Sequence, residues 1–143
     1  MRIFLDANVL VAVINKEYPL FTHAARIVSL SDTKQFEVFT SPLCLAIAFY
    51  FAEKKNKKTA KQKIRLLTAN LAIAAVDEKC VHETVQNKSV NDFEDGLEYY
   101  AAANNNCKCI ITEDKSDFYF SELEVLNCEE FFEKYMVRKR QQY

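Results

Sequence analysis

Carboxylate side chains occur at three separate places in this chain, each close to a stretch that could form a buried element. Asp6 follows a run of three apolar residues near the amino terminus, and Asp114 lies just past a second apolar run. Asp92 and Asp95 are three positions apart and so share one face of a predicted helix. Hard divalent ions such as Mg²⁺ and Mn²⁺ prefer oxygen ligands of this kind. Such an ion can activate a bound water for attack on a phosphodiester.

The elements that must position these acids alternate along the chain between strand and helix. Apolar runs predict five strands, at residues 2–5, 36–40, 71–76, 109–112 and 124–126. Longer periodic segments predict helices at residues 7–14, 19–30, 42–55, 59–69, 77–86, 91–104 and 128–138. Asp6 or Asn8 should cap the first helix, and Asn91 the sixth. The alternation predicts an α/β fold with a mainly parallel sheet of about five strands, as one domain spanning residues 1–143.

In open α/β sheets, ligands bind beyond the carboxyl ends of the strands, which is where we place Asp6 and Asp114. Crowded carboxylates raise each other's pKa unless a cation lies between them. A purely structural role is the alternative for most of the acids. Asp92 and Glu94 would be favourable near a helix start, and Asp117 could be an ordinary loop acid. Asp6 is harder to explain this way, because burying an acid at the end of a strand costs free energy unless hydrogen bonds or an opposite charge compensate for it.

The predicted helix at residues 42–55 is apolar almost all round over its first ten residues. We therefore expect it to be buried on most sides. The chain is also rich in aromatic residues, with eleven Phe and seven Tyr. We expect most of them in the core and some on a dimer or partner surface, where aromatic side chains are enriched.

Length and composition describe a chain of 143 residues, half of them hydrophobic, which is enough for a substantial core. No apolar run approaches the ~20 residues that would cross a bilayer. No secretory signal is visible, so we expect a cytoplasmic protein without a membrane partner. The five cysteines are scattered and odd in number, which favours reduced thiols.

Basic residues are concentrated in one segment, although the formal net charge is only −1. Residues 54–65 contain seven Lys or Arg and no acid, and Arg138, Lys139 and Arg140 follow near the carboxyl end. Such a segment could hold a polyanion. The alternative is a solvated helix surface with no ligand. The candidate polyanion-binding residues are Lys54, Lys55, Lys57, Lys58 and Lys61.

Other reactive residues give weaker signals. His23 and His82 lie on different predicted helices and are expected to have surface or packing roles. Cys107 and Cys109 could bind a metal or be redox-active, but alternate strand positions favour packing. The single glycine in the chain excludes a phosphate-binding loop of the glycine-rich types.

Three segments together resemble the PIN domain. They are residues 6–8 (Asp-Ala-Asn), residues 92–102 (beginning Asp-Phe-Glu-Asp-Gly) and residues 110–118 (beginning Ile-Ile-Thr-Glu-Asp). The likeness is strongest to the small single-domain ribonucleases related to the toxins of VapBC toxin–antitoxin pairs, and it extends over essentially the whole chain.

This resemblance implies a three-layer α/β/α fold and a hydrolase that cleaves RNA with Mg²⁺ or Mn²⁺. It also implies a homodimer and, for toxin members, a cognate antitoxin protein that covers the site. On this likeness Asp6, Asp95 and Asp114 match the metal-binding acids, whereas Asn8 and Thr112 match polar residues beside them. Asp92 and Asp117 are possible further ligands.

The sequence departs from this family pattern in one place. Many members carry a glutamate in the helix after the second strand, but here that helix has no acid before Glu53, which we do not assign to the site. Asp92, Glu94 or Asp117 could compensate, or a second metal could be absent. The second hypothesis is therefore a catalytically weakened PIN-like domain that binds RNA or protein. A phosphatase of the haloacid dehalogenase type would need Asp-x-Asp where this chain has Asp-Ala-Asn.

Overall fold

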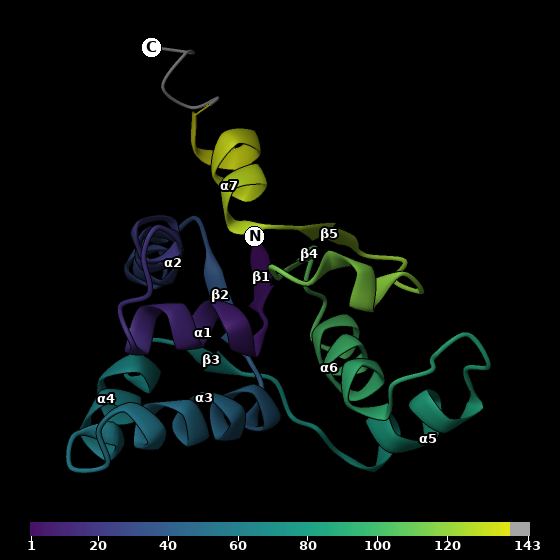
Figure 1. The fold of residues 1–143 in the computed structure, drawn as a ribbon. Helices are drawn as coiled ribbons and strands as arrows, with labels where there is room; N and C mark the ends of the chain where they lie inside the picture. Colours follow the sequence, from purple (N-terminus) through teal and green to yellow (C-terminus); the bar gives the residue numbers. More distant parts are fainter. Residues whose placement is uncertain (138–143) are drawn as a thin grey trace.

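The computed structural model describes residues 1–137, so Arg138, Lys139 and Arg140 lie outside the described residues. One five-stranded sheet forms the centre of the molecule (Figure 1). Its strands are ordered β3-β2-β1-β4-β5, and every neighbouring pair is parallel. The strands are β1 (Arg2–Leu5), β2 (Glu37–Thr40), β3 (Ala72–Ile73), β4 (Cys109–Ile111) and β5 (Glu124–Leu126). The predicted α/β fold with a parallel sheet is confirmed.

Seven α-helices connect or follow the strands within the described residues. They are α1 (Ala7–Ile14), α2 (Leu20–Ser29), α3 (Pro42–Lys55), α4 (Ala60–Thr68), α5 (Glu78–Gln86), α6 (Phe93–Asn104) and α7 (Cys128–Phe131). Two short 3₁₀ turns, η1 (Leu30–Asp32) and η2 (Lys115–Phe118), and a π-helical turn, η3 (Phe132–Val137), complete the elements.

Five of the seven α-helices begin where a side chain accepts a hydrogen bond from a free backbone amide, whereas α2 and α4 have no side-chain cap. Asp6 caps α1 and Ser41 caps α3, the latter followed by proline in the first turn. Helix α6 is capped by Asp92, whose Oδ1 accepts from the Asp95 amide at 3.1 Å. The expectation that Asn91 would be this cap was wrong by one residue, because the side chain that reaches the third helical amide is that of Asp92.

The order of the strands creates a switch point beside β1. From β1 the chain steps outward through β2 to β3 and then returns to β4 on the other side of β1. Because parallel crossovers are right-handed, helices α1–α4 and α5–α6 cover opposite faces. In Figure 1 the purple to teal helices α1–α4 lie together, apart from the green helix α6. Leu5 pairs with Ile111 at the carboxyl ends of β1 and β4. Ligands of open α/β sheets bind beyond the strand ends at a switch point of this kind.

The core is built on β1 and β4, which are buried on both faces as strands in a covered parallel sheet must be. Ile3, Phe4, Leu5, Ile110 and Ile111 have no exposed side-chain surface. The predicted strand at residues 71–76 is shorter than expected: only Ala72 and Ile73 pair, at the edge of the sheet. Within residues 1–137, no helix has the length and apolar character required for a membrane span.

Helix α3 is less buried than its sequence predicted. Its buried residues are Cys44, Ala48 and Ala52, which recur every four positions and form one stripe of small side chains. Helix α3 contacts α1 and α4, and its larger residues Leu45, Ile47 and Phe49 are only partly buried against the core. Tyr50 is 54% exposed and Phe51 is 42% exposed. The expected burial on most sides was therefore wrong.

The single glycine allows α5 and α6 to pack closely. A Cβ atom at Gly96 would lie 2.4 Å from Cγ2 of Thr84 and 2.8 Å from Cγ1 of Val90. Because Gly96 follows Asp95 directly, this contact also fixes the first turn of the helix that carries the second group of acids.

Candidate metal centre

Asp6 lies at the carboxyl end of β1, where its backbone amide donates to the Ile111 carbonyl at 3.0 Å. Its side chain is only 8% exposed. Oδ1 accepts from the Ala7 amide at 2.7 Å, and Oδ2 accepts from the Thr112 hydroxyl at 2.8 Å. These hydrogen bonds compensate for the loss of water around a buried carboxylate, and they fix the direction of its oxygen atoms.

Asn8 and Thr112 link Asp6 to the acid from the next strand. The Thr112 hydroxyl is fully buried and accepts from the Asp114 amide at 3.0 Å. The Asn8 amide nitrogen lies 3.1 Å from Oδ2 of Asp114 and 3.4 Å from Oδ2 of Asp6. Its amide oxygen accepts from the Glu113 amide at 3.2 Å. The residues predicted to flank the acids thus form the hydrogen-bonded bridge between them.

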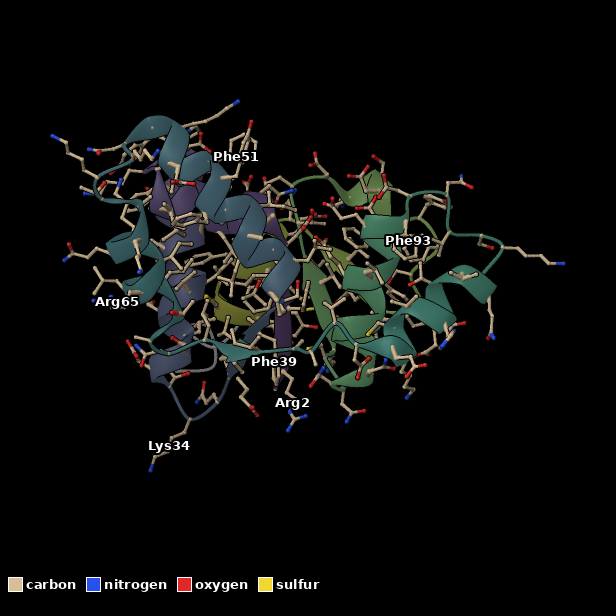
Figure 2. The ribbon with its side chains drawn as sticks, turned by 90° about the horizontal axis from the view of Figure 1, so that it is seen from below. Arg2, Lys34, Phe39, Phe51, Arg65 and Phe93 are labelled. Atoms are coloured by element: carbon tan, nitrogen blue, oxygen red, sulfur yellow. The ribbon has the colours of Figure 1, made fainter. Side chains whose placement is uncertain are left out.

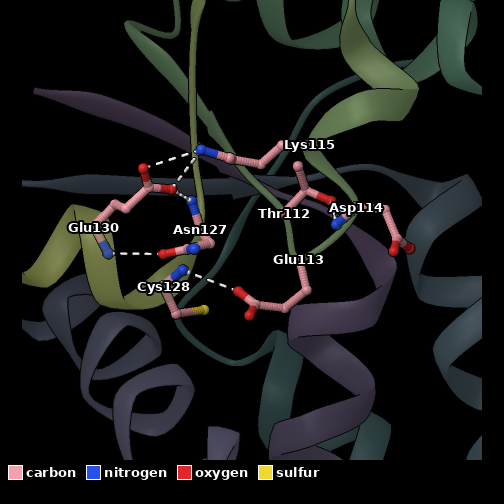
Figure 3. Close-up of polar contacts among 7 residues, drawn as sticks. All are labelled: Thr112, Glu113, Asp114, Lys115, Asn127, Cys128 and Glu130. Atoms are coloured by element: carbon pink, nitrogen blue, oxygen red, sulfur yellow. Dashed lines mark hydrogen bonds and ion pairs between the residues drawn. The ribbon is translucent and has the colours of Figure 1, made fainter.

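The loop that carries Asp114 is held by the start of α7 (Figure 3). Glu113 accepts from the Cys128 amide at 2.9 Å, and Lys115 pairs with Glu130 at 2.8 Å. Figure 3 shows the Asp114 carboxylate pointing away from these contacts. Glu113 therefore has a structural role, whereas Asp114 remains available to a ligand.

Helix α6 brings Glu94 and Asp95 to the same place. Both line a pocket of about 400 Å³. The remaining lining residues are Asp6, Ala7, Asn8, Val11, Glu17, Ile47, Phe51, Asp114 and Asp117. Asp92 does not line it, since its carboxylate caps α6. The structure therefore brings Asp6, Asp95, Asp114 and Asp117 together, with Asp92 just outside.

Electrostatics in this pocket favour a cation. Burial first, and then the charges of Asp92, Asp117, Asp6 and Glu94, raise the pKa of Asp95 to about 7. Burial and neighbouring acids also raise the pKa of Glu94 and of Asp117. No basic side chain lines the pocket among the described residues. Mutual repulsion of this kind is relieved when a divalent ion binds, and the all-oxygen donor set fits Mg²⁺ or Mn²⁺.

Glu98 is an acid of this region that the sequence analysis missed. It is 1% exposed and accepts a hydrogen bond from the Cys44 thiol at 3.2 Å. One ligand atom from each of Asp6, Cys44 and Glu98 lies within 4.8 Å of the other two. Burial, and next the charge of Asp6, raises the pKa of Glu98 to about 10. The sequence spacing could have indicated Glu98 as a site residue, because it follows Glu94 by one helical turn and therefore lies on the same face of α6.

Helix α3 contributes Ile47 and Phe51 to the pocket rather than a carboxylate. Glu53 does not line it, in agreement with its omission from the predicted site. The missing family glutamate is thus replaced by apolar surface at this wall.

The lysine-rich segment lies at the end of α3 and the start of α4, and its lysines do not line the pocket. Lys55 donates to the Asn15 carbonyl, and Lys54 lies over the ring of Tyr50, with 4.9 Å between its Nζ and the ring centroid. Lys57, Lys58 and Lys61 are exposed. Their role in RNA binding stays a prediction.

The remaining cysteines and histidines have packing or surface positions. All five cysteines are free and buried. Burial raises the pKa of both Cys107 and Cys109 to about 12, which keeps them protonated and unreactive. His23 packs edge-on against Phe132, and His82 is an exposed partner of Glu78.

Comparison with known proteins defines the class. The PIN domain family matches residues 2–116, which is most of the chain. The chain therefore belongs to the PIN domain family, and its parallel sheet with acids at the β1–β4 switch point is the structure expected for that family.

Particular relatives include a protein named as a ribonuclease and, in fold, one named as a toxin. The chain is 30% identical over 138 residues to Ribonuclease VapC1 of Aquifex aeolicus, covering 94% of this chain and 95% of that protein. Its fold is similar to VapBC2 from Rickettsia felis bound to a promoter DNA fragment, with a TM-score of 0.69, 20% identity, and coverage of 89% of this chain and 98% of that one. VapC20 of Mycobacterium tuberculosis, a toxin that cleaves the sarcin-ricin loop, gives a TM-score of 0.63, 18% identity, and coverage of 85% and 98%.

Proposed function

We propose that this protein is a metal-dependent endoribonuclease and the toxin of a toxin–antitoxin pair. The observation that carries the proposal is the meeting of Asp6, Asp95 and Asp114 from three segments in one pocket, where Asn8 joins Asp6 to Asp114. The 30% sequence identity to a ribonuclease over nearly the whole chain supports RNA as the substrate. We propose further that residues 1–143 form one domain.

The three acids would hold the ion, which we propose to be Mg²⁺ or Mn²⁺. When bound, it would lower the pKa of a coordinated water and offset charge on the phosphodiester. Thr112 and the Ala7 amide orient Asp6, and Asn8 orients Asp114. Asp95 would lose its proton on becoming a ligand, because its raised pKa of about 7 keeps part of it protonated at neutral pH. Asp117, at the rim, is a further candidate ligand.

The test is RNA cleavage by purified protein with Mn²⁺ or Mg²⁺, comparing the natural chain with Asp6→Asn. We expect cleavage by the first and none by the second. Glu129→Gln is the matched control, because Glu129 is an exposed acid outside the pocket. Absence of cleavage by the natural chain over varied RNAs and both ions would contradict the proposal.

A second candidate is a binding module that has lost catalysis. It is favoured by one observation, the presence of Ile47 where α3 would otherwise present a carboxylate. Calorimetric titration with Mn²⁺ separates the two, since a binding module without the metal centre should show no site that Asp6→Asn removes.

The partners that we propose are an antitoxin protein and a second copy of this chain. Structures of VapBC2 and FitAB, which are related in fold, contain toxin and antitoxin together. Coexpression with the product of an adjacent small reading frame should give a complex that no longer cleaves RNA. Light scattering of the isolated protein should give the mass of a dimer.

A further inference from the structure

We propose that Tyr119 is a positioning residue for the metal centre, because its hydroxyl group joins the segment that carries Asp114 and Asp117 to the segment that leads into Asp95. This inference rests on the proposed metal-dependent function and assigns a role there to a residue that does not line the pocket.

The acids of the pocket come from segments that are joined unequally. The amide nitrogen of Asn8 links Asp6 to Asp114, whereas the carboxylates in the first turn of α6 have no hydrogen bond to either of these two within residues 1–137. In Figure 2 side-chain oxygen atoms gather between α3 and the start of α6, which Phe93 marks. Carboxylates at such close range repel one another when no ion lies between them. Contacts outside the pocket must therefore hold the start of α6 near the other acids.

The hydroxyl group of Tyr119 supplies such a contact. It accepts a hydrogen bond from the Asn91 amide at 3.1 Å and donates one to the Ser89 carbonyl. Both partners belong to the loop between α5 and α6, and Asn91 directly precedes Asp92, the residue that caps α6. One hydroxyl group thus fixes two backbone positions immediately before the helix begins.

Each side of this contact leads directly to acids that line the pocket. On the α6 side, Oδ1 of Asp92 accepts from the Asp95 amide at 3.1 Å. On the other side, Tyr119 follows η2 directly, and the turn of η2 is closed by the Asp117 amide, which donates to the Asp114 carbonyl at 3.0 Å. Tyr119 therefore connects the turn that holds two of the acids with the loop that determines where α6 starts.

Packing accounts for the ring of Tyr119 but not for its hydroxyl group. The ring centroid lies 5.4 Å from that of Phe120, which packs edge-on against Tyr99 of α6. A phenylalanine at position 119 would keep these ring contacts. The middle of α6 is also held independently, since the Tyr99 hydroxyl accepts from the Glu122 amide at 3.3 Å. What the Tyr119 hydroxyl adds is a hold on the start of α6, where the acids lie.

Holding the acids in place before an ion arrives makes binding of the ion tighter. If the start of α6 were free to move outward, binding would also have to overcome the cost of drawing it back against the repulsion of the other carboxylates. Residues that do not touch a metal commonly tune its affinity by orienting those that do. The net contribution of one hydrogen bond corresponds to roughly 2- to 12-fold in an equilibrium constant, and we expect an effect of this size.

Tyr119→Phe tests the role, because it removes the hydroxyl group and keeps the ring. Tyr18→Phe is the matched control, since Tyr18 is 70% exposed and its hydroxyl has no hydrogen bond within the described residues. Calorimetric titration should give an affinity for Mn²⁺ roughly 2- to 12-fold weaker for Tyr119→Phe than for the natural chain, with no change in the control. An unchanged affinity in Tyr119→Phe, or an equal loss in the control, overturns the inference.

Amide hydrogen exchange in EDTA gives a second measurement, made without any metal. The amides of residues 91–95 should exchange faster in Tyr119→Phe than in the natural chain, whereas those of α1 should be unaffected. Saturating Mg²⁺ should remove the difference, because the ion then holds the acids itself. Melting temperatures should be similar, since water can replace the hydroxyl as a partner of an exposed loop. Faster exchange throughout the chain would show a general loss of stability and overturn the positioning role.

Cleavage of RNA in Mn²⁺ separates this inference from the nuclease function. Cleavage together with equal Mn²⁺ affinities of the natural chain and Tyr119→Phe overturns the role of Tyr119 and leaves the nuclease in place. Weaker Mn²⁺ binding by Tyr119→Phe, with no cleavage by the natural chain, supports the role and contradicts the nuclease. Failure of the natural chain to bind Mn²⁺ overturns both.

Discussion

Glu98 is predicted to be protonated in the folded protein at neutral pH, so replacing it with neutral glutamine should stabilise the fold. Its pKa rises from 4.5 to about 10, because the side chain is buried and faces Asp6. In the unfolded chain the group ionises above about pH 4.5. The stability contributed by a group with a raised pKa is fully present below the unfolded value and is lost as the pH rises toward the folded value.

The magnitude follows from this window. Each pH unit between the two pKa values lowers stability by about 1.36 kcal/mol. Relative to glutamine, Glu98 should therefore cost under about 1 kcal/mol near pH 5, about 3 kcal/mol near pH 7 and about 5 kcal/mol near pH 8. Glutamine has nearly the same shape and can still donate toward Asp6 and accept from the Cys44 thiol.

The assay is denaturant unfolding of the natural chain and Glu98→Gln with EDTA present, at several values between about pH 5 and about pH 8. We expect the glutamine variant to be more stable, by a margin that grows with pH. Glu129→Gln, at an exposed position, should show no such growth. A glutamine variant that is less stable at every pH, or a margin independent of pH, would refute a protonated Glu98.

Three further predictions concern the pocket and helix α6. Asp6→Asn should abolish RNA cleavage yet leave the melting temperature unchanged or higher, because asparagine can still cap α1 and removes one of several repelling charges. The affinity for Mn²⁺ measured by calorimetry should be about tenfold higher near pH 8 than near pH 6, because binding displaces a proton from Asp95, whose pKa is about 7; equal affinities would exclude Asp95 as a ligand. Gly96→Ala should lower the free energy of unfolding by about 1–3 kcal/mol, because the new methyl group would overlap Thr84 and Val90, and unchanged stability would contradict the close contact of α5 with α6.

The sequence by itself determined the strands, most helices and the principal acids. Asp6 could be placed because an apolar strand that ends in a carboxylate is a local pattern, and parallel strands must then bring Asp6 and Asp114 to one edge of the sheet. Asn8 and Thr112 were expected beside the acids only through the resemblance to the PIN domain. The strands and Asp6 depend on residues close together in the chain, so local periodicity and capping chemistry were sufficient to predict them.

Tertiary structure decided the features that depend on which face of an element is covered. Glu98 has the same residue type and helical setting as a surface acid, and only packing against Cys44 and Asp6 makes it a buried one. Conversely, Phe51 reads as a core residue, but small residues form the contact stripe of α3 and leave its ring at the pocket. Burial is a property of what lies opposite a side chain, and that neighbour comes from a distant part of the sequence.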